Sequence, residues 1–223
     1  MRWCVSLAEA DMKFPTREEM YRALEERHGA ELQKKLSEAS VAVCGLGGLG
    51  SNIAIALARA GVGTLHILDF DRVDISNLNR QQYFPEQLGM YKTDALSDTL
   101  RRIAPYCNIR KDCVKLTEEN IPVLLSPVNI ICEAFDKADQ KAMLVNCVLE
   151  SMPEKYLVAG SGMAGIGPSN AITTRRMMKR FYLCGDGSSD VDDGMGLVAS
   201  RVLICAAHQA NAVIRIIAGE YDV

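Results

Sequence analysis

One stretch, VAVCGLGGLGSNIAIALARAGVGTLHILDFD (residues 41–71), constrains the fold more than any other part of the chain. A short apolar run enters a glycine-rich turn, small and apolar residues follow at helical spacing, and a second apolar run ends at Asp69. This succession is typical of a βαβ unit, in which two parallel strands flank a helix. We predict a strand over 41–44, a helix over 51–60 that ends at Gly61, and a strand over 64–69.

The glycines of this turn suit a phosphate site; they are Gly45, Gly47, Gly48 and Gly50. Glycine permits a tight turn and close approach of a phosphate to the backbone, and the helix N-terminus adds N–H donors and partial positive charge. Asp69 stands 19 residues after Gly50, where an acid can accept hydrogen bonds from a ribose. We predict a bound nucleotide rather than a turn without ligand, but these residues do not separate NAD from ATP.

Further strands and helices alternate along the chain, which favours a parallel sheet. The patterns predict a helix from Thr16 towards Leu36 with a break at Gly29, and a long crossing over 72–92. Further helices are predicted over 93–103, 118–125 and 137–151, and further strands over 109–115, 128–132 and 156–160. Residues 170–195 show no clear pattern, and a final helix follows them. The fold class is therefore α/β, Rossmann-like, with a mostly parallel sheet and helices on both faces. We expect a loosely ordered leader over 1–13 and one nucleotide-binding domain over 14–223.

Composition narrows the class of protein. The net charge of −3, from 25 basic and 28 acidic residues, argues against nucleic-acid binding, which usually requires a basic surface. Polar residues interrupt the apolar run 196–219, so it predicts a half-buried helix and not a membrane span. The eight cysteines form no C-x-x-C pair, so we expect no zinc site of that kind, and reduced cysteines suit a cytoplasmic protein.

The residues after Asp69 read DFDRVDISNLNRQQYF and then GMYK. A dehydrogenase needs no cations here, because its cofactor keeps its phosphates. An enzyme that breaks ATP at the α-phosphate must neutralise charge on the leaving pyrophosphate, and Asn77, Arg80 and Lys92 suit that work. An NAD-dependent oxidoreductase stays an alternative, since the glycines and Asp69 permit it, although no His or Tyr–Lys pair stands out as a proton donor.

The strings GLGGLGS and DFDRVDISNLNRQ resemble the ubiquitin-activating-enzyme superfamily in its bacterial ThiF and MoeB branch. The chain is most similar to the short ThiF-type proteins associated with thiamine thiazole synthesis. Those proteins adenylate the C-terminal glycine of a small ubiquitin-like sulfur carrier. The resemblance implies an adenylation fold, ATP and Mg²⁺, a ThiS-like carrier, a homodimer, and a sulfur donor such as a cysteine desulfurase. A superfamily member that adenylates a tRNA base is a further alternative.

The resemblance also implies roles for single residues. Asp69, with Asp71 near it, would hold the nucleotide ribose, Asn77 and Arg80 would contact phosphates, and Gln81 would support their loop. Lys92 would pair with the β- and γ-phosphates. Asp136 would coordinate Mg²⁺, its alternative role being the N-cap of the following helix; Lys137 stands where the family usually has asparagine.

Two further candidates are less well defined. The family uses an N-terminal arginine in the partner subunit's site, and among Arg17, Arg22 and Arg27 we favour Arg27. Many relatives add a cysteine step, for which Cys184 is the candidate, because FYLCGDG predicts a loop and nearby basic residues would favour a thiolate. The alternative is an inert, partly exposed cysteine.

Overall fold

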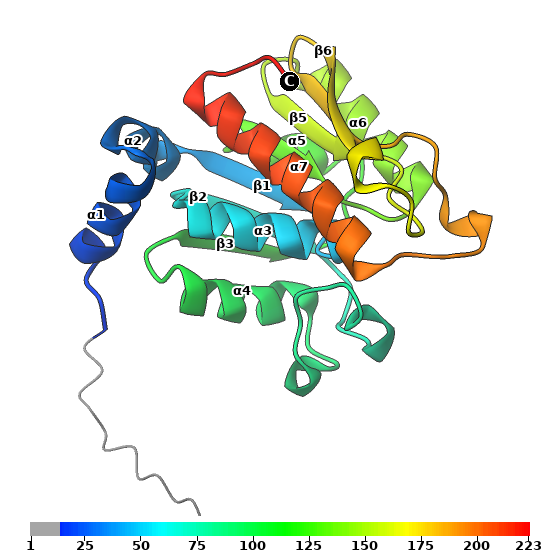
Figure 1. Ribbon diagram of the computed structural model, residues 1–223, viewed down its shortest axis with the longest axis horizontal. Coiled ribbons are helices and arrows are strands. Elements are labelled where there is room, and N and C mark those ends of the chain that lie inside the picture. The colour runs from blue at the N-terminus through cyan, green and yellow to red at the C-terminus, as the bar shows by residue number, and fades with distance from the viewer. Residues whose placement is uncertain (1–13) are drawn as a thin grey trace, which may run out of the picture.

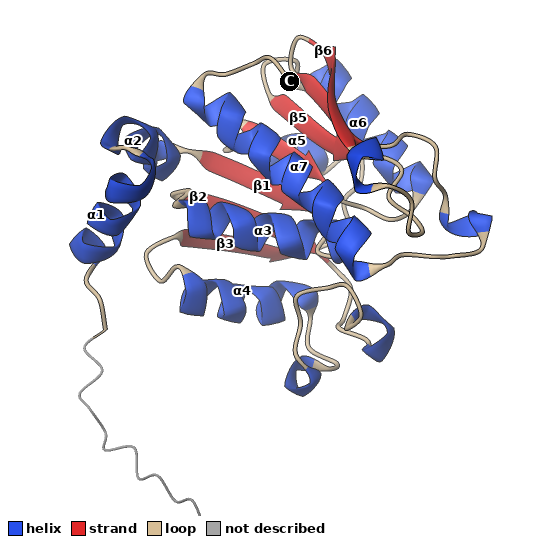
Figure 2. Ribbon diagram, viewed as in Figure 1, coloured by secondary structure: helices blue, strands red, loops and turns tan. Residues whose placement is uncertain are grey.

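The computed structural model describes residues 14–223, so the predicted leader over 1–13 lies outside the described residues. One seven-stranded sheet runs through the protein, with helices on both of its faces (Figures 1 and 2). The strands are β1 (Ser40–Cys44), β2 (Thr64–Asp69), β3 (Asn108–Cys113), β4 (Ile130–Glu133), β5 (Tyr156–Gly160), β6 (Thr173–Met178) and β7 (Phe181–Gly185). The helices are α1 (Arg17–His28), α2 (Ala30–Glu38), α3 (Gly48–Ala60), α4 (Lys92–Ile103), α5 (Ile121–Leu125), α6 (Ala138–Ser151) and α7 (Ala199–Ala218).

The strand order is β3-β2-β1-β4-β5-β7-β6, and only the β6–β7 pair is antiparallel among the described strands. The predicted Rossmann-like, mostly parallel sheet is therefore confirmed. After β1 the chain adds strands on one side through β2 and β3, and then returns to place β4 on the other side. The crevice between the carboxyl ends of β1 and β4 is the topological switch point, where open α/β sheets bind ligands.

Two apolar clusters hold the layers together. On one face α3, α4 and α7 cover the sheet, with Ile53, Leu100 and Val213 among the fully buried side chains. On the other face α5 and α6 pack, through residues such as Leu125 and Val148. Figure 2 shows these helices as separate layers in front of and behind the strands. Because both faces are covered, the central strands are mostly apolar, as in other parallel sheets. His66 on β2 and Glu133 on β4 are buried polar exceptions.

Helices α1 and α2 confirm the predicted helix with a break at Gly29, whose φ of 91° suits glycine. Thr16 and Glu19 form the expected capping box. Helix α1 buries none of its residues, whereas α2 buries Gln33 and Leu36. Helix α1 lies at the periphery of the protein in Figure 1.

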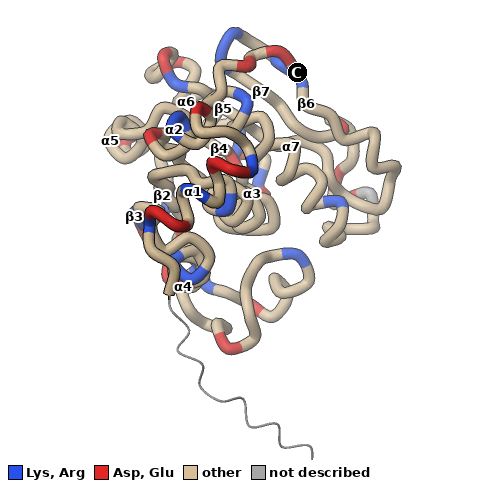
Figure 3. The backbone as a smooth tube through the Cα atoms, turned by 60° about the vertical axis from the view of Figure 1, so that its left-hand side comes forward, with Lys and Arg blue, Asp and Glu red and all other residues tan. Residues whose placement is uncertain are grey.

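Helix α7 is long and apolar enough to cross a membrane by length and composition, but half of that stretch is buried inside the protein. It packs against α3 and along β5 and β7, as expected of the predicted half-buried helix. Basic and acidic residues are interspersed along the chain rather than gathered in one segment (Figure 3).

The structure adds one hairpin that the sequence pattern did not reveal. Residues 170–195, which gave no clear pattern, contain β6 and β7. Strand β6 forms an edge of the sheet, and most of its side chains are exposed. An edge strand exposed in this way has no apolar alternation to detect, since neither face needs a continuous apolar row.

Candidate functional site

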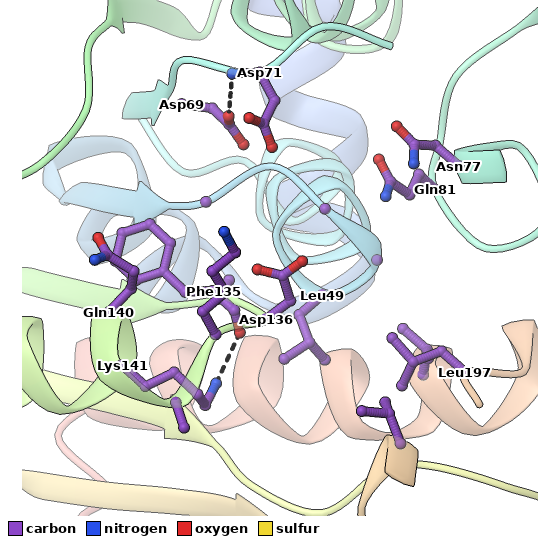
Figure 4. A pocket seen from close by; sticks show the side chains of 18 of the residues that line it. Leu49, Asp69, Asp71, Asn77, Gln81, Phe135, Asp136, Gln140, Lys141 and Leu197 are labelled. Atoms are coloured by element: carbon purple, nitrogen blue, oxygen red, sulfur yellow. Dashed lines mark hydrogen bonds between the residues drawn. The ribbon is translucent and has the colours of Figure 1, made fainter. Parts of the chain in front are cut away.

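A pocket of about 770 Å³ lies at the carboxyl ends of the parallel strands. The loops after β1, β2, β4 and β5 form its walls, and the crossing before α4 closes one side. Predicted site residues around it are Gly45, Gly47, Gly48, Asp69, Asp71, Asn77, Arg80, Gln81, Lys92 and Asp136. In Figure 4 the carboxylates of Asp69, Asp71 and Asp136 point into this pocket from different elements. The topology thus brings together residues that are far apart in the sequence.

The glycines of the turn do different work. Gly45 has a φ of 89°, and a Cβ there would lie 2.9 Å from the carbonyl oxygen of Ala134 at the end of β4. A Cβ on Gly50 would lie 1.8 Å from the carbonyl oxygen of Gly45, so the turn itself requires glycine at 50. Gly47 is different, because the nearest atom to its Cβ position is 3.8 Å away, on Gln81. Gly45 and Gly50 are needed by the fold, whereas a Cβ at Gly47 would make only an ordinary van der Waals contact with Gln81.

Helix α3 begins within this turn, at Gly48, three residues earlier than predicted. Its N-cap, Gly47, offers no side-chain hydrogen bond to the first turn. The first N–H groups of a helix have no partners inside it, so they remain available to an anion. The N-terminus of α3 therefore presents N–H donors at the pocket, as the phosphate prediction requires.

Asp69 is 8% exposed and is held at both oxygens. Its Oδ2 accepts a hydrogen bond from the N–H of Leu46 at 2.6 Å, and its Oδ1 accepts one from the N–H of Asp71 at 2.8 Å. Burial raises the pKa of this carboxyl, although the charge of Lys92 and the two N–H donors oppose the shift. Asp69 joins the end of β2 to the glycine turn of β1, which fixes the acid beside the α3 N-terminus.

Lys92, at the first position of α4, forms an ion pair with Asp71, with 3.0 Å between Nζ and Oδ2. The lysine side chain is 8% exposed, whereas that of Asp71 is 53% exposed. The ammonium is therefore anchored in the protein while its partner faces solvent. A bound phosphate could pair with the Lys92 ammonium beside this exposed carboxylate or in its place.

The crossing is fastened to α3. The Tyr83 hydroxyl donates to the carbonyl of Leu46 at 2.8 Å, and the N–H of Gln82 donates to Ser51 Oγ at 3.1 Å. Asn52 Nδ2 donates to the carbonyl of Arg80 at 3.3 Å. Ser51, Asn52 and Tyr83 were missed by the sequence analysis, although they lie inside or beside the quoted motifs and could have been found there.

Arg80 lies on the pocket wall with part of its guanidinium in use. Its Nη1 donates to the Ser76 carbonyl at 3.1 Å and to Asn79 Oδ1 at 2.9 Å. Its buried Nε has no hydrogen-bond partner among the described residues. The guanidinium of Arg80 is therefore only partly engaged within the protein. Asn77 and Gln81 lie together on the same side of the pocket in Figure 4.

Asp136 lies in the turn between β4 and α6 and is exposed to the pocket. Its alternative role is wrong, because Lys137 and not Asp136 occupies the N-cap of α6. The turn is braced from behind, since Lys141 Nζ donates to the carbonyl of Phe135 at 2.9 Å and pairs with Glu133 at 3.0 Å. Glu133 Oε1 in turn accepts from the N–H of Phe135 at 2.7 Å. This Glu133–Lys141 pair was not predicted from the sequence.

No group of three or more His, Cys, Asp or Glu side chains suited to a metal occurs in the described part of the chain. Mg²⁺ does not need such a group, because it keeps several waters and binds through one or two carboxylates and the substrate phosphates. A single free carboxylate beside a phosphate site fits that chemistry. Asp136 fits the donor set of the expected ion.

The expected loop position of Cys184 is wrong. Cys184 lies on β7 and is 0% exposed. Its carbonyl oxygen accepts a hydrogen bond from the thiol of Cys205 on α7. Burial raises the pKa of its thiol to about 11, against the weaker effects of Thr174 and Arg175. The thiolate fraction at neutral pH is therefore small, and the basic neighbours do not activate the sulfur. The alternative of a partly exposed cysteine is also wrong, since the thiol is covered.

Arg27 is exposed on α1 and is not part of the pocket wall of its own chain. A role in the site of a second subunit stays a prediction.

Two curated proteins show what the chain is similar to. The chain is 36% identical over 137 residues to adenylyltransferase and sulfurtransferase MOCS3 of Anopheles gambiae, covering 60% of this chain and 30% of that protein. It is 29% identical over 196 residues to the molybdopterin-synthase adenylyltransferase of Salmonella typhimurium, covering 84% and 76%. The chain spans about a third of the length of the MOCS3 proteins that it matches.

Among solved structures, the E. coli tRNA N6-threonylcarbamoyladenosine dehydratase TcdA in complex with ATP superposes with a TM-score of 0.82. The two sequences are 19% identical, and the match covers 90% of this chain and 94% of that one, which establishes a shared fold. The ThiF family model matches residues 21–223. With that match spanning the sheet, the pocket and all of its walls, the protein belongs to the ThiF family.

Proposed function

We propose that this protein adenylates the C-terminal carboxylate of a small ubiquitin-like sulfur-carrier protein, using ATP. The observation that carries the proposal is one pocket that combines a ribose-type acid, Asp69, with two cations, Arg80 and Lys92, and a free carboxylate, Asp136. A cofactor that keeps its phosphates does not need that combination. Family membership and the adenylyltransferase names of the MOCS3 and Salmonella relatives support the same reaction.

In the proposed reaction a carboxylate oxygen of the carrier attacks the α-phosphorus of ATP. The bond between that phosphorus and the oxygen bridging to the β-phosphorus breaks, and pyrophosphate leaves with the bonding electrons. An acyl-adenylate remains on the carrier. No proton transfer is required of the enzyme, so positioning and charge stabilisation supply the rate acceleration.

Each residue acts through its place in the pocket. Asp69 and the α3 N-terminus would hold the ribose and a phosphate, while Arg80 and Lys92 would neutralise charge that moves onto pyrophosphate. Asp136 and the ATP phosphates would hold Mg²⁺, which supplies Lewis-acid charge stabilisation when bound. The Glu133–Lys141 pair would keep the Asp136 turn in position.

Finer assignments follow from the resemblance. We propose that residues 14–223 act as one adenylation domain, that the carrier is ThiS-like, and that the product serves thiocarboxylate formation for thiamine thiazole synthesis. The homodimer, the sulfur donor and the role of Arg27 in a partner subunit's site belong to the same proposal. Cys184 is no longer part of it, because the thiol is buried in β7.

The test is ATP–pyrophosphate exchange with Mg²⁺, measured without a carrier, with a ThiS-like carrier and with a MoaD-like carrier, each ending in Gly-Gly. We expect exchange that depends on the ThiS-like carrier and is lost in Arg80→Ala. Arg59→Ala, an exposed arginine at the end of α3, serves as the matched control. Exchange with the MoaD-like carrier alone would keep adenylation and overturn the thiamine assignment.

Absence of exchange with every carrier, together with tight binding of NAD, would overturn adenylation and favour the oxidoreductase. Carrier-independent adenylation of tRNA would instead favour a nucleic-acid substrate. These outcomes separate the classes of function.

A further inference from the structure

We propose that Asp186 and Arg201 form a clasp that positions the wall of the pocket against which the carrier's C-terminus lies. This inference rests on the proposed function for the identity of the acceptor. The clasp is defined by these two residues and joins three segments: the loop after β5, the loop after β7, and the start of α7.

The two side chains are buried and held by several hydrogen bonds, and the buried Nε of Arg201 is left without a partner among the described residues. Arg201 is 5% exposed and Asp186 is 9% exposed in their side chains, and they form an ion pair. Arg201 Nη1 also donates to the carbonyls of Gly167 and Pro168, at 2.6 and 3.0 Å. Asp186 Oδ1 accepts from the N–H groups of Ser188 and Ser189, each at 2.8 Å. One guanidinium thus holds one loop by its backbone and the other through a carboxylate.

The loops on either side of the clasp are the loops that line the pocket. Ser161, Gly162, Met163 and Ala164 lie before the first attachment, and Ser189, Asp190 and Val191 follow the second. Backbone bonds connect the two loops directly, from Asp186 N–H to the Gly162 carbonyl and from Gly187 N–H to the Ser161 carbonyl. The Ala164 N–H donates to Ser189 Oγ at 3.1 Å. Displacement of the clasp would therefore displace the pocket wall.

The backbone is shaped around the clasp. A Cβ on Gly162, which has a φ of 79°, would lie 2.1 Å from Asp186 Oδ1. A Cβ on Gly167 would lie 3.2 Å from the guanidinium of Arg201. Glycine is required at 162 both by its conformation and by the carboxylate beside it. The sequence GSGMAGIG, whose glycines the proposed reaction did not use, fits closely around this ion pair.

The position of the clasp separates it from the nucleotide residues. The glycine turn, Asp69, Arg80 and Lys92 come from β1, β2, the crossing and α4, whereas the hydrogen bonds of Asp186 and Arg201 go to the loops after β5 and β7. The start of α7 and the segment just before it do approach the nucleotide side, at Gly48 through Val202 and at Asn79 through Leu197. The opposite wall, built by the loops after β5 and β7, is the side left for the acceptor. Asp186 and Arg201 are accordingly positioning residues for the acceptor, with no expected effect on ATP affinity.

Two conservative variants test the clasp. Arg201→Lys keeps the charge but cannot reach two carbonyls and a carboxylate at once, and Asp186→Asn keeps the shape without the charge. Arg215→Lys is the matched control, because Arg215 lies on the same helix and its side chain bonds the Asp222 carbonyl near the C-terminus. We expect KM for the carrier to rise about tenfold or more in both variants, with Kd for ATP within about twofold of wild type. Equal losses in both parameters, or no change in either, would overturn the clasp.

Amide hydrogen exchange supplies a readout that does not need the reaction. In Arg201→Lys we expect faster exchange in 161–168 and 186–190 and unchanged exchange in α3 and β1. Amide exchange that is faster throughout the protein, or that is unchanged in these two loops, contradicts the proposal. A wild-type protein without carrier-dependent pyrophosphate exchange would count against the proposed function alone, because the hydrogen-exchange pattern still decides whether the clasp holds the two loops.

Discussion

The carboxylate of Asp69 accepts a hydrogen bond from the backbone N–H of Leu46, with 2.6 Å between Oδ2 and nitrogen. The acid that ends β2 therefore holds the glycine turn that follows β1. Any ribose bound there would use the remaining lone pairs of a carboxylate that already organises the phosphate loop. Nucleotide affinity and loop geometry are coupled through this one side chain.

Asp69→Asn should weaken ATP binding about 10- to 100-fold, because the amide nitrogen cannot accept a hydrogen bond from either the loop or the ribose. Isothermal titration with ATP and Mg²⁺ measures the effect. Asp98→Asn, an exposed aspartate on α4, is the control. A dissociation constant within about twofold of wild type would remove Asp69 from the nucleotide site.

Lys92→Met should lower pyrophosphate exchange about 100-fold while leaving the fold intact. The methionine fills most of the space of the buried stem but carries no charge to meet the leaving pyrophosphate. Asp71, the direct partner of Lys92, is half exposed, and the buried Asp69 keeps its hydrogen bonds from the N–H groups of Leu46 and Asp71 when the lysine charge is lost. Exchange kinetics and the thermal midpoint should be measured beside Lys111→Met, a lysine paired with Asp94 away from the pocket. Undiminished exchange in Lys92→Met would rule out its proposed role.

The glycines should separate into two groups. Gly45→Ala places a Cβ 2.9 Å from the Ala134 carbonyl oxygen at a φ of 89°, so it should cost about 1–3 kcal/mol of stability. In Gly47→Ala the nearest atom to the new Cβ is 3.8 Å away in the free protein. This variant should therefore keep the wild-type free energy of unfolding yet bind ATP weakly. Urea unfolding and ATP titration of both variants decide the matter. Tight ATP binding by Gly47→Ala would show that no phosphate approaches this backbone.

Much of the fold could be predicted from the sequence because its signals were local. The strands β1, β2 and β5 are buried and mostly apolar, and Gly61 ends α3 in the left-handed conformation as expected. The strand order could not be predicted, since it depends on how distant segments pair. Residues of the motif between β1 and α4 were found readily, because motif and loop coincide.

The remaining features depend on tertiary contacts. The Glu133–Lys141 pair and the Asp186–Arg201 clasp each join residues whose charges have no local pattern. Cys184 was misplaced because its flanking Gly185 and Asp186 suggested a loop, whereas Gly185 ends β7 at a φ of 134°. Pairing of β7 with β5 and β6 supplies the stability that the local sequence does not indicate.

Cys184→Ala should retain pyrophosphate exchange within about twofold of wild type, because a buried thiol with a pKa of about 11 supplies no thiolate to a bound adenylate. Iodoacetamide should modify the exposed Cys113 in the native protein and reach Cys184 only after unfolding. Mass spectrometry of tryptic peptides identifies the modified residue. Rapid alkylation of native Cys184 would show that β7 opens, and would restore the cysteine step as a hypothesis.

The clasp should also give a defined pH dependence of stability. Burial alone would raise the pKa of Asp186, but hydrogen bonds from Ser189, Ser188 and Arg201 prevail and hold it well below the ordinary value. A depressed pKa in the folded state contributes stability that is present above the unfolded value, about pH 4, and is lost as pH falls further.

Removing one partner of a buried pair costs about 3 kcal/mol at neutral pH, so Asp186→Asn should be less stable than wild type by about that much. The difference in unfolding free energy should shrink as pH falls from about 7 to about 3, because the unfolded wild-type chain then takes up a proton at this carboxyl while the folded protein keeps it ionised. Urea unfolding of wild type, Asp186→Asn and the exposed control Asp98→Asn measures it, and a difference that stays constant over this range would mean that Asp186 carries no charge in the clasp.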